Sequence, residues 1–214
     1  MTEPREMPDA LLLLAPGCPH CPAVLEGLSG LVKEGAIGRL EAVNIVVHPE
    51  RAAELGVRSV PWARIGEFEL EGVQTPGDLR RWAELSGTPR GMPEYFLHLL
   101  KHGRRDKVEA MARREPRRLL ALVMLLADES SMAVRLGIGA VLEEFQGDAI
   151  AEVMIPGLGE LTRHADALTR ADACHYLSLI GGERIVPYLK TCLADENAEV
   201  REIAAETLAE MGVR

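Results

Sequence analysis

The pattern of apolar residues changes near the middle of this 214-residue chain. Up to about residue 88, short apolar runs typical of strands alternate with helical spacing, and beyond that point only helical spacing is found. A stretch rich in helix breakers, GTPRGMP at residues 87–93, separates the two patterns. The sequence therefore predicts an α/β domain at residues 1–88, a linker at 89–94 and an all-helical domain at 95–214.

The first half predicts a mixed sheet with helices, in the order β-α-β-α-β-β-α. The two buried strands are predicted from continuous apolar runs, the helices from i, i+3, i+4 spacing, and a hairpin from the turn signal at Gly66-Glu67. The predicted strands are residues 10–15, 40–47, 61–65 and 68–70, and the predicted helices are 23–34, 48–55 and 76–85. Pro76 suits the start of the last helix.

The second half contains an internal repeat. The segments LADESSMAVR and LADENAEVR end at Arg135 and Arg201, and Arg170 occupies a comparable place in ALTRADACHYL. Pro156 and Pro187 also correspond, 31 residues apart (187 − 156). Each unit is predicted to contain a polar corner, a helix with an early arginine, a glycine-containing turn and a second helix that carries a proline.

This repeat resembles the HEAT type over roughly residues 95–214, although its period is shorter than the ~40 residues of standard units and residues 94–115 fit poorly. Helix pairs of this kind bury their apolar faces by stacking on their neighbours. The resemblance implies an extended surface for a protein partner. An ordinary helical bundle is the alternative.

The most informative short motif is CPHC, which follows the first predicted strand. Placed at the N-cap of the next helix, with Pro19 as its first residue, Cys18 would lie beside free backbone N–H groups that stabilise a thiolate. Cys21 lies three residues on, within reach of a disulfide bond, and is expected to be the more buried of the two. The pair predicts redox chemistry, in which Cys18 attacks and Cys21 resolves the mixed disulfide. Zinc is the rival, but a structural site needs four ligands and no second CxxC is present.

A second motif, Val60-Pro61, lies 43 residues beyond Cys18 (61 − 18) and precedes the predicted hairpin. Together, the motifs and the element order resemble the thioredoxin superfamily over residues 8–88. The resemblance implies that the Val60-Pro61 bond is cis, and that Val60 and Pro61 face the CxxC and bind an extended substrate segment. Trp62, the next residue, is expected in the core or at the rim of the domain, and it is a further candidate for the border of the substrate groove.

The dipeptide inside the motif resembles that of bacterial disulfide oxidases of the same superfamily. We expect Pro19 and His20 to tune the Cys18 thiolate, because a neighbouring histidine can donate a hydrogen bond or a positive charge to it. The reduction potential is then expected between the about −270 mV of thioredoxin and the about −120 mV of the strongest oxidases. The chain departs from the thioredoxin pattern at Gly17, where tryptophan is usual, and at Leu12, near which a buried acid is usual.

The composition argues against some classes of binding partner. Asp and Glu number 33 against 24 Lys and Arg, for a net charge of −9, which argues against a nucleic-acid-binding protein. No apolar run approaches the ~18 residues of a membrane span, and the N-terminus lacks the basic and apolar regions of a signal peptide. We expect a cytoplasmic protein with no cofactor. Abundant Ala, Leu, Arg and Gly are typical of a GC-rich bacterial genome.

Two other features are predicted to be structural, and a third has both a structural and a binding interpretation. Cys174 and Cys192 appear isolated and suit apolar filling, and His98 and His102 suit a solvated helix face without a third metal ligand. The stretch 101–118 is predicted either to dock an acidic partner or to pair with acidic residues of the repeats. Its basic residues are Lys101, Arg104, Arg105, Lys107, Arg113, Arg114, Arg117 and Arg118.

Two functions follow. The first is a thiol–disulfide oxidoreductase that acts on protein thiols or disulfides in cellular redox homeostasis, with the helical repeats holding a protein partner. The second is a scaffold or adaptor in which the helical array is the working surface and the first domain senses redox state or only binds.

Overall fold

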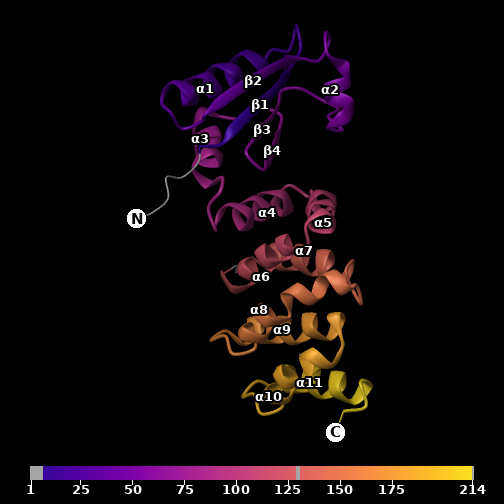
Figure 1. Cartoon of the computed structure of the whole chain (residues 1–214). Helices are drawn as coiled ribbons and strands as arrows, with labels where there is room; N and C mark the ends of the chain where they lie inside the picture. The colour runs from indigo at the N-terminus through magenta and orange to yellow at the C-terminus, as the bar shows by residue number, and fades with distance from the viewer. Residues whose placement is uncertain (1–6, 129–130, 214) are drawn as a thin grey trace. The chain divides into compact units, whose positions relative to one another are not determined.

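The computed structural model describes residues 7–128 and 131–213, and the chain divides into two compact units, Met1–Gly91 and Met92–Arg214 (Figure 1). The described part of the first unit contains strands and helices, whereas that of the second contains helices and turns. The predicted fold class, an α/β domain followed by an all-helical one, is confirmed.

The first helix after the predicted boundary, α4 (Gly91–Lys101), starts inside the segment 89–94 that the sequence predicts to be a linker. Pro93 is its third residue, and the first helical turn tolerates proline because the N–H groups there have no intrahelical acceptor. The breakers at this point therefore mark the start of a helix as well as the change of unit.

The sheet of the first unit consists of β1 (Asp9–Leu14), β2 (Arg39–Asn44), β3 (Trp62–Ile65) and β4 (Phe68–Glu71). The strand order is β2-β1-β3-β4, with β2 parallel and β3 antiparallel to the central strand β1 (Figure 1). β3 and β4 form the predicted hairpin, and Gly66 supplies the positive φ (55°) that its turn requires.

The helices of this unit are α1 (Cys21–Lys33), α2 (Pro49–Glu54) and α3 (Pro76–Leu85), so the predicted element order is confirmed. α1 and α3 contact each other and the sheet, and Gly27 permits this because a Cβ there would lie 2.8 Å from Leu79 Cδ1. A separate apolar cluster contains Leu11, Leu13, Val43 and Trp62, against which Ala52 of α2 packs.

The second strand differs from its prediction. β2 ends at Asn44 and Val43 is its one buried residue, whereas the sequence predicts a buried strand over residues 40–47. β2 is an edge strand, so it has a neighbour on one side only. Beyond Asn44 the chain turns, with the Val46 N–H bonded to the Asn44 side chain, and Val46 and Val47 are exposed.

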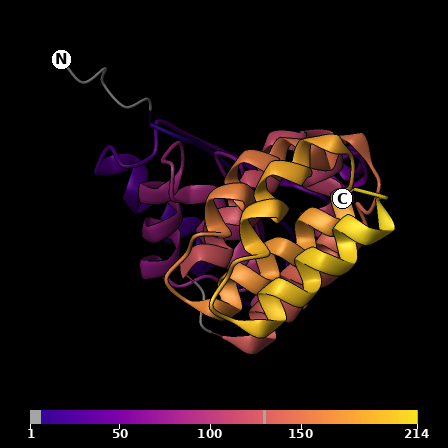
Figure 2. The same cartoon turned by 90° about the horizontal axis from the view of Figure 1, so that it is seen from below.

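The described part of the second unit is formed by eight α-helices joined by turns and three 3₁₀ segments. After α4 come α5 (Arg105–Arg114), α6 (Leu119–Asp128), α7 (Met132–Glu143), α8 (Ile155–Leu161), α9 (Ala167–Ile180), α10 (Val186–Cys192) and α11 (Ala198–Glu210). The last helices pack side by side, α11 against both α9 and α10 (Figure 2). Pro156 and Pro187 each lie at the second residue of a helix, after a 3₁₀ segment.

The repeated arginines make repeated contacts. Arg170 donates hydrogen bonds to the backbone carbonyls of His164 and Ala165, and Arg201 donates likewise to those of Asp195 and Glu196. Each arginine thus ties its helix to the corner that precedes it.

Two of these arginines also connect successive repeats. Arg135 on α7 donates to Thr169 and Asp172 of α9, and Arg170 on α9 makes a two-point ion pair with Asp195, ahead of α11. The corner motif noticed in the sequence is therefore a device for stacking. Residues 129–130 of its first copy lie outside the described part of the chain.

Candidate active site

The two cysteines of the CPHC motif form a disulfide at the beginning of α1. Their Cα atoms are 5.5 Å apart, within the range typical of disulfides. Cys18 is half-buried, whereas only 4% of the surface of Cys21 is exposed. The pair thus has an outer and an inner sulfur, as predicted.

The helix begins later than predicted. α1 starts at Cys21 with His20 as its N-cap, so the placement of Cys18 at the N-cap and Pro19 at the first helical position is wrong. Pro19 and His20 form a bend outside the helix, and Pro22 takes the early position that suits proline. The Cys18 sulfur still faces the N-terminus of the helix, because it accepts a 3.2 Å hydrogen bond from the Cys21 N–H.

The dipeptide between the cysteines is open to solvent. Pro19 and His20 are both exposed, and the His20 side chain makes no capping hydrogen bond. Its ring can therefore turn toward Cys18 without losing such a bond. Pro22 removes no helical hydrogen bond, because N–H groups in the first turn lack intrahelical acceptors.

The Val60-Pro61 loop faces the cysteine pair. The peptide bond between these residues is cis, as the family resemblance implies, and the Cys18 sulfur lies 3.8 Å from the Val60 carbonyl oxygen. A disulfide sulfur carries no proton, so this contact can become a hydrogen bond only in the thiol form. Val60 is half-buried and Pro61 is buried, so Val60 is the more accessible of the two residues.

Two side chains of the sheet belong to the core. Trp62, a predicted substrate contact, has only 2% of its surface exposed and packs against Leu11, Leu13 and Val43. Of the positions that the sequence leaves open for Trp62, the structure shows the core, because β3 turns this side chain into the sheet's apolar cluster. Leu12 is fully buried, so the position where the family commonly holds an acid is apolar here.

The structure brings together two cysteines that look isolated in the sequence. Cys174 on α9 and Cys192 at the end of α10 have sulfur atoms 3.1 Å apart, and both side chains are buried. The hydrogen bond that Cys174 donates to Cys192, together with burial, raises the pKa of the Cys174 thiol. The usable signal was the repeat itself, because both cysteines lie on apolar faces of consecutive helices.

The remaining candidates have structural surroundings. The rings of His98 and His102 are tilted against each other with centres 4.3 Å apart, and no group of three or more metal-ligating side chains occurs among the described residues. The basic stretch 101–118 forms ion pairs within itself and with the repeats. These pairs include Arg104–Asp106, Arg105–Glu109, Arg118–Glu115 and Arg113–Asp148.

No helix within residues 7–128 and 131–213 is long and apolar enough to span a bilayer. The first six residues, part of the basis for predicting no signal peptide, lie outside the described part of the chain.

Comparisons with known proteins agree with this geometry. A family model for the thioredoxin domain matches residues 10–84, and one for HEAT repeats matches residues 155–213. A thioredoxin from Methanocaldococcus jannaschii is 34% identical over 68 residues, which cover 30% of this chain and 78% of that protein. The HEAT match covers the later part of the predicted array. Through its first unit, which carries the Cys18–Cys21 pair beside a cis-proline loop, the chain belongs to the thioredoxin family.

Proposed function

We propose that this protein is a thiol–disulfide oxidoreductase whose reactive dithiol is Cys18 and Cys21. The observation that carries the proposal is the placement of a half-exposed sulfur at a helix N-terminus, with a second, buried sulfur bonded to it. The Cys21 N–H, which already bonds the Cys18 sulfur, would stabilise the thiolate that reduction releases.

The reaction is a two-step exchange. The Cys18 thiolate attacks one sulfur of a substrate disulfide, forms a mixed disulfide and releases the other substrate sulfur as a thiolate. Cys21 loses its proton and attacks the Cys18 sulfur, which restores the internal disulfide and releases the second substrate thiolate. Two electrons pass to the substrate, and both of its thiolates take up protons from solvent. The reverse sequence oxidises a substrate dithiol.

Substrate positioning falls to Val60 and Pro61. The carbonyl oxygen of Val60 is the backbone group beside the Cys18 sulfur, and it can accept a hydrogen bond from an extended substrate segment. Pro19 and His20, exposed next to the outer sulfur, are the residues proposed to tune the thiolate. The helical unit would bind the protein that carries the substrate disulfide.

Reduction of insulin by the full chain, followed by turbidity, tests the catalytic proposal. Cys18→Ser should reduce the rate to that of the uncatalysed reaction, because removal of a nucleophile abolishes the covalent step. Cys174→Ser is the matched control, since it removes a thiol that is buried in the other unit. Activity that survives Cys18→Ser, or that disappears with Cys174→Ser, would contradict the assignment.

The adaptor function remains as a second candidate, and the HEAT match at residues 155–213 favours it. A Cys21→Ser variant should hold partner proteins as mixed disulfides that reductant releases. A full chain carrying both Cys18→Ser and Cys21→Ser supplies the comparison. Partners held equally well by the double variant, with none linked through sulfur, would favour the adaptor.

A further inference from the structure

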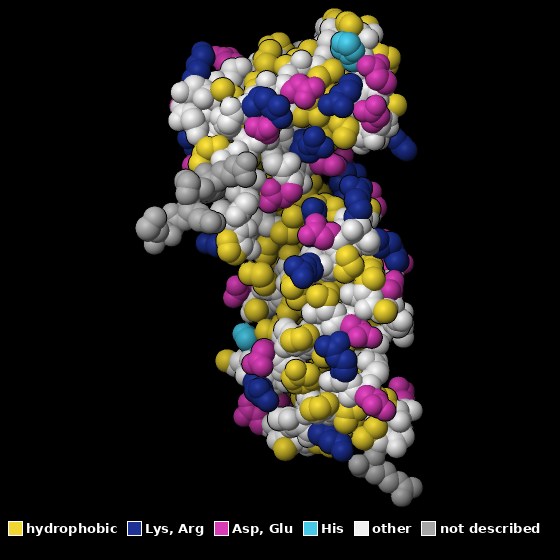
Figure 3. Space-filling view, viewed as in Figure 1, with side chains coloured by type: hydrophobic (Ala, Val, Ile, Leu, Met, Phe, Trp, Pro, Cys, Tyr) yellow, Lys and Arg dark blue, Asp and Glu magenta, His cyan; other side chains and the backbone are white. Residues whose placement is uncertain are grey.

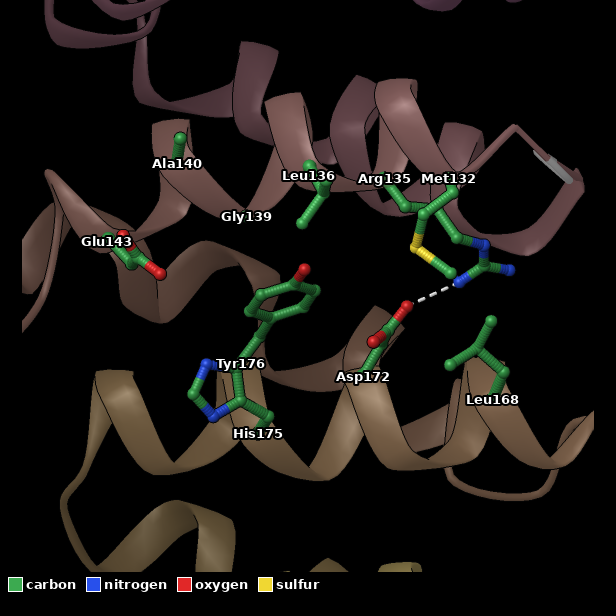
Figure 4. Close-up of a pocket in the computed structure, with 10 residues that line it drawn as sticks. All are labelled: Met132, Arg135, Leu136, Gly139, Ala140, Glu143, Leu168, Asp172, His175 and Tyr176. Atoms are coloured by element: carbon green, nitrogen blue, oxygen red, sulfur yellow. Dashed lines mark hydrogen bonds and ion pairs between the residues drawn. The ribbon is translucent and has the colours of Figure 1, made fainter.

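A groove of about 380 Å³ lies between α7 and α9 of the helical unit (Figure 4). One of its walls is apolar, built from Met132 and Leu136 of α7 and Leu168 of α9. These side chains are exposed, and 67% of the Leu136 surface is open to solvent. Figure 3 shows hydrophobic side chains interspersed with charged ones on one face of this unit. Apolar side chains gathered around a groove indicate a place for an apolar group of a ligand.

A polar group lies at the floor of the groove. Tyr176 on α9 has 5% of its surface exposed, and its hydroxyl points toward α7 (Figure 4). The hydroxyl has no hydrogen-bond partner among the described residues. Gly139 leaves the space above it, because a Cβ at that position would lie 3.0 Å from the hydroxyl oxygen. A tyrosine buried in this way usually bonds a partner, so the unused hydroxyl points to a ligand with a polar group.

The charge of the groove is negative. The Arg135 guanidinium already donates hydrogen bonds to Asp172, Thr169 and the Leu126 carbonyl. Its positive charge is therefore balanced by Asp172 within the fold. The Glu143 side chain, at the other end of the groove, is exposed, and its carboxylate forms no ion pair or hydrogen bond within the part of the chain that the structure describes.

The raised pKa of Tyr176 is consistent with these negative surroundings. Burial raises the pKa of Tyr176 to about 12, with further contributions from the nearby Asp172 and Glu143 carboxylates. The hydroxyl is therefore a neutral group at neutral pH that can accept or donate a hydrogen bond. A cation is the ligand group that both the free carboxylate and the hydroxyl oxygen can bind.

We infer that this groove binds a basic, amphipathic segment of the partner protein, with an apolar side chain against Leu136 and a lysine or arginine at Glu143 and the Tyr176 hydroxyl. Leu136 and Glu143 are seven residues apart on one helix, a rise of about 10 Å. A helical segment with leucine on one turn and lysine two turns later matches that distance. The net charge of −9 favours the approach of such a segment and repels nucleic acid.

The inference rests on the proposed function in one respect, because it names the chemistry of the partner that the helical unit would bind. A synthetic cysteine-free peptide, labelled with a fluorophore, serves as the probe. It carries leucine on one turn and lysine two turns later, and a second peptide replaces the lysine with glutamate. Fluorescence anisotropy with the full chain should show the lysine peptide binding at least about tenfold more tightly.

Glu143→Lys should abolish or reverse the preference for the lysine peptide. Glu144→Lys is the matched control, because Glu144 is the next residue, is exposed and does not line the groove. Leu136→Ser should weaken both peptides, whereas Leu193→Ser, another exposed leucine of this unit, should weaken neither. Circular dichroism of each variant verifies that its helices are intact.

Equal binding of the two peptides, or equal effects of Glu143→Lys and Glu144→Lys, would overturn the inference. The peptides contain no sulfur, so their binding is independent of disulfide exchange. If the peptides fail to discriminate, only the groove proposal is refuted, and the insulin assay still tests the proposed function. If the Cys18–Cys21 dithiol is inactive, the preference for the lysine peptide is still expected.

Discussion

The chain contains two cysteine pairs in surroundings that differ in almost every respect. Cys18 and Cys21 are three residues apart, form a disulfide, and place one sulfur at the surface beside a backbone N–H. Cys174 and Cys192 are 18 residues apart, and both are buried between helices. The comparison teaches that closeness of two sulfurs is insufficient for exchange, because the attacking sulfur must also be accessible and ionised.

The largest expected difference between the two cysteine pairs is in the rate at which an alkylating reagent reaches their thiols. In the reduced full chain, iodoacetamide should alkylate Cys18 at least about a thousandfold faster than Cys174 or Cys192, since buried thiols react only after local opening that costs about 4 kcal/mol or more. Mass spectrometry of peptides from timed samples measures each rate. Denaturant should remove the difference, and labelling of Cys174 as fast as Cys18 in the native protein would break the comparison.

Tuning of the outer sulfur should have the next largest effect. His20→Thr removes a group that can donate a hydrogen bond or charge to the thiolate, so the disulfide becomes a weaker oxidant. We expect the reduction potential of the Cys18–Cys21 pair to fall by about 30 mV, a tenfold change in the exchange equilibrium. Equilibration with glutathione measures it. His175→Thr, in the helical unit, is the control, and an unchanged potential in His20→Thr would exclude the tuning role.

The two pairs should contribute unequally to folding. Under reducing conditions, Cys174→Ala should lower the free energy of unfolding by about 1 kcal/mol, because it removes a packed buried atom. Cys18→Ala should change it by no more than about 0.5 kcal/mol, since the Cys18 side chain is partly solvated. Urea unfolding followed by circular dichroism gives both values. A larger loss for Cys18→Ala would contradict this division.

The smallest expected effect is the pH dependence of folding stability that comes from the Arg170–Asp195 ion pair near the buried cysteines. The hydrogen bonds from Arg170 hold the pKa of Asp195 below its ordinary value. The ionised carboxylate therefore stabilises the folded state above the ordinary Asp pKa of about 3.9, and this stabilisation is lost as the pH falls through the lower folded-state pKa.

Unfolding in urea at about pH 6 and about pH 3 tests this sign. Asp195→Asn should be less stable than the wild type at the higher pH, and the two should converge at the lower. Asp106→Asn, whose carboxylate is largely exposed in a surface ion pair, should follow the wild type at both. A constant difference between Asp195→Asn and wild type across this range would refute the role of the Asp195 charge.

The sequence was informative where structure is local. The element order follows from apolar periodicity, and the closeness of Cys18 to Cys21 follows from their spacing of three. The start of α1 was missed because two prolines, Pro19 and Pro22, each suit a first turn, and only the folded backbone distinguishes them. The contact between Cys18 and Val60 could be anticipated only from family resemblance, since it joins residues 42 apart.

Features set by packing were harder to predict. Trp62 begins a strand in which alternate side chains face opposite sides of the sheet, and the sequence does not say which side is covered. Cys174 on α9 and Cys192 at the end of α10 meet only once α9, α10 and α11 are packed together, which the sequence alone does not specify. The groove between α7 and α9 likewise requires two separate helices to be placed before Tyr176 and Glu143 come together.

A redox titration of the full chain tests the central claim most directly. The protein is equilibrated in thiol–disulfide buffers of known potential, and differential alkylation with mass spectrometry counts the thiols at each cysteine. We predict that Cys18 and Cys21 titrate together as a two-electron pair between about −270 and about −120 mV, while Cys174 and Cys192 remain thiols throughout. A titration in which Cys18 and Cys21 stay reduced, or in which the buried pair oxidises at the same potential, would contradict the account.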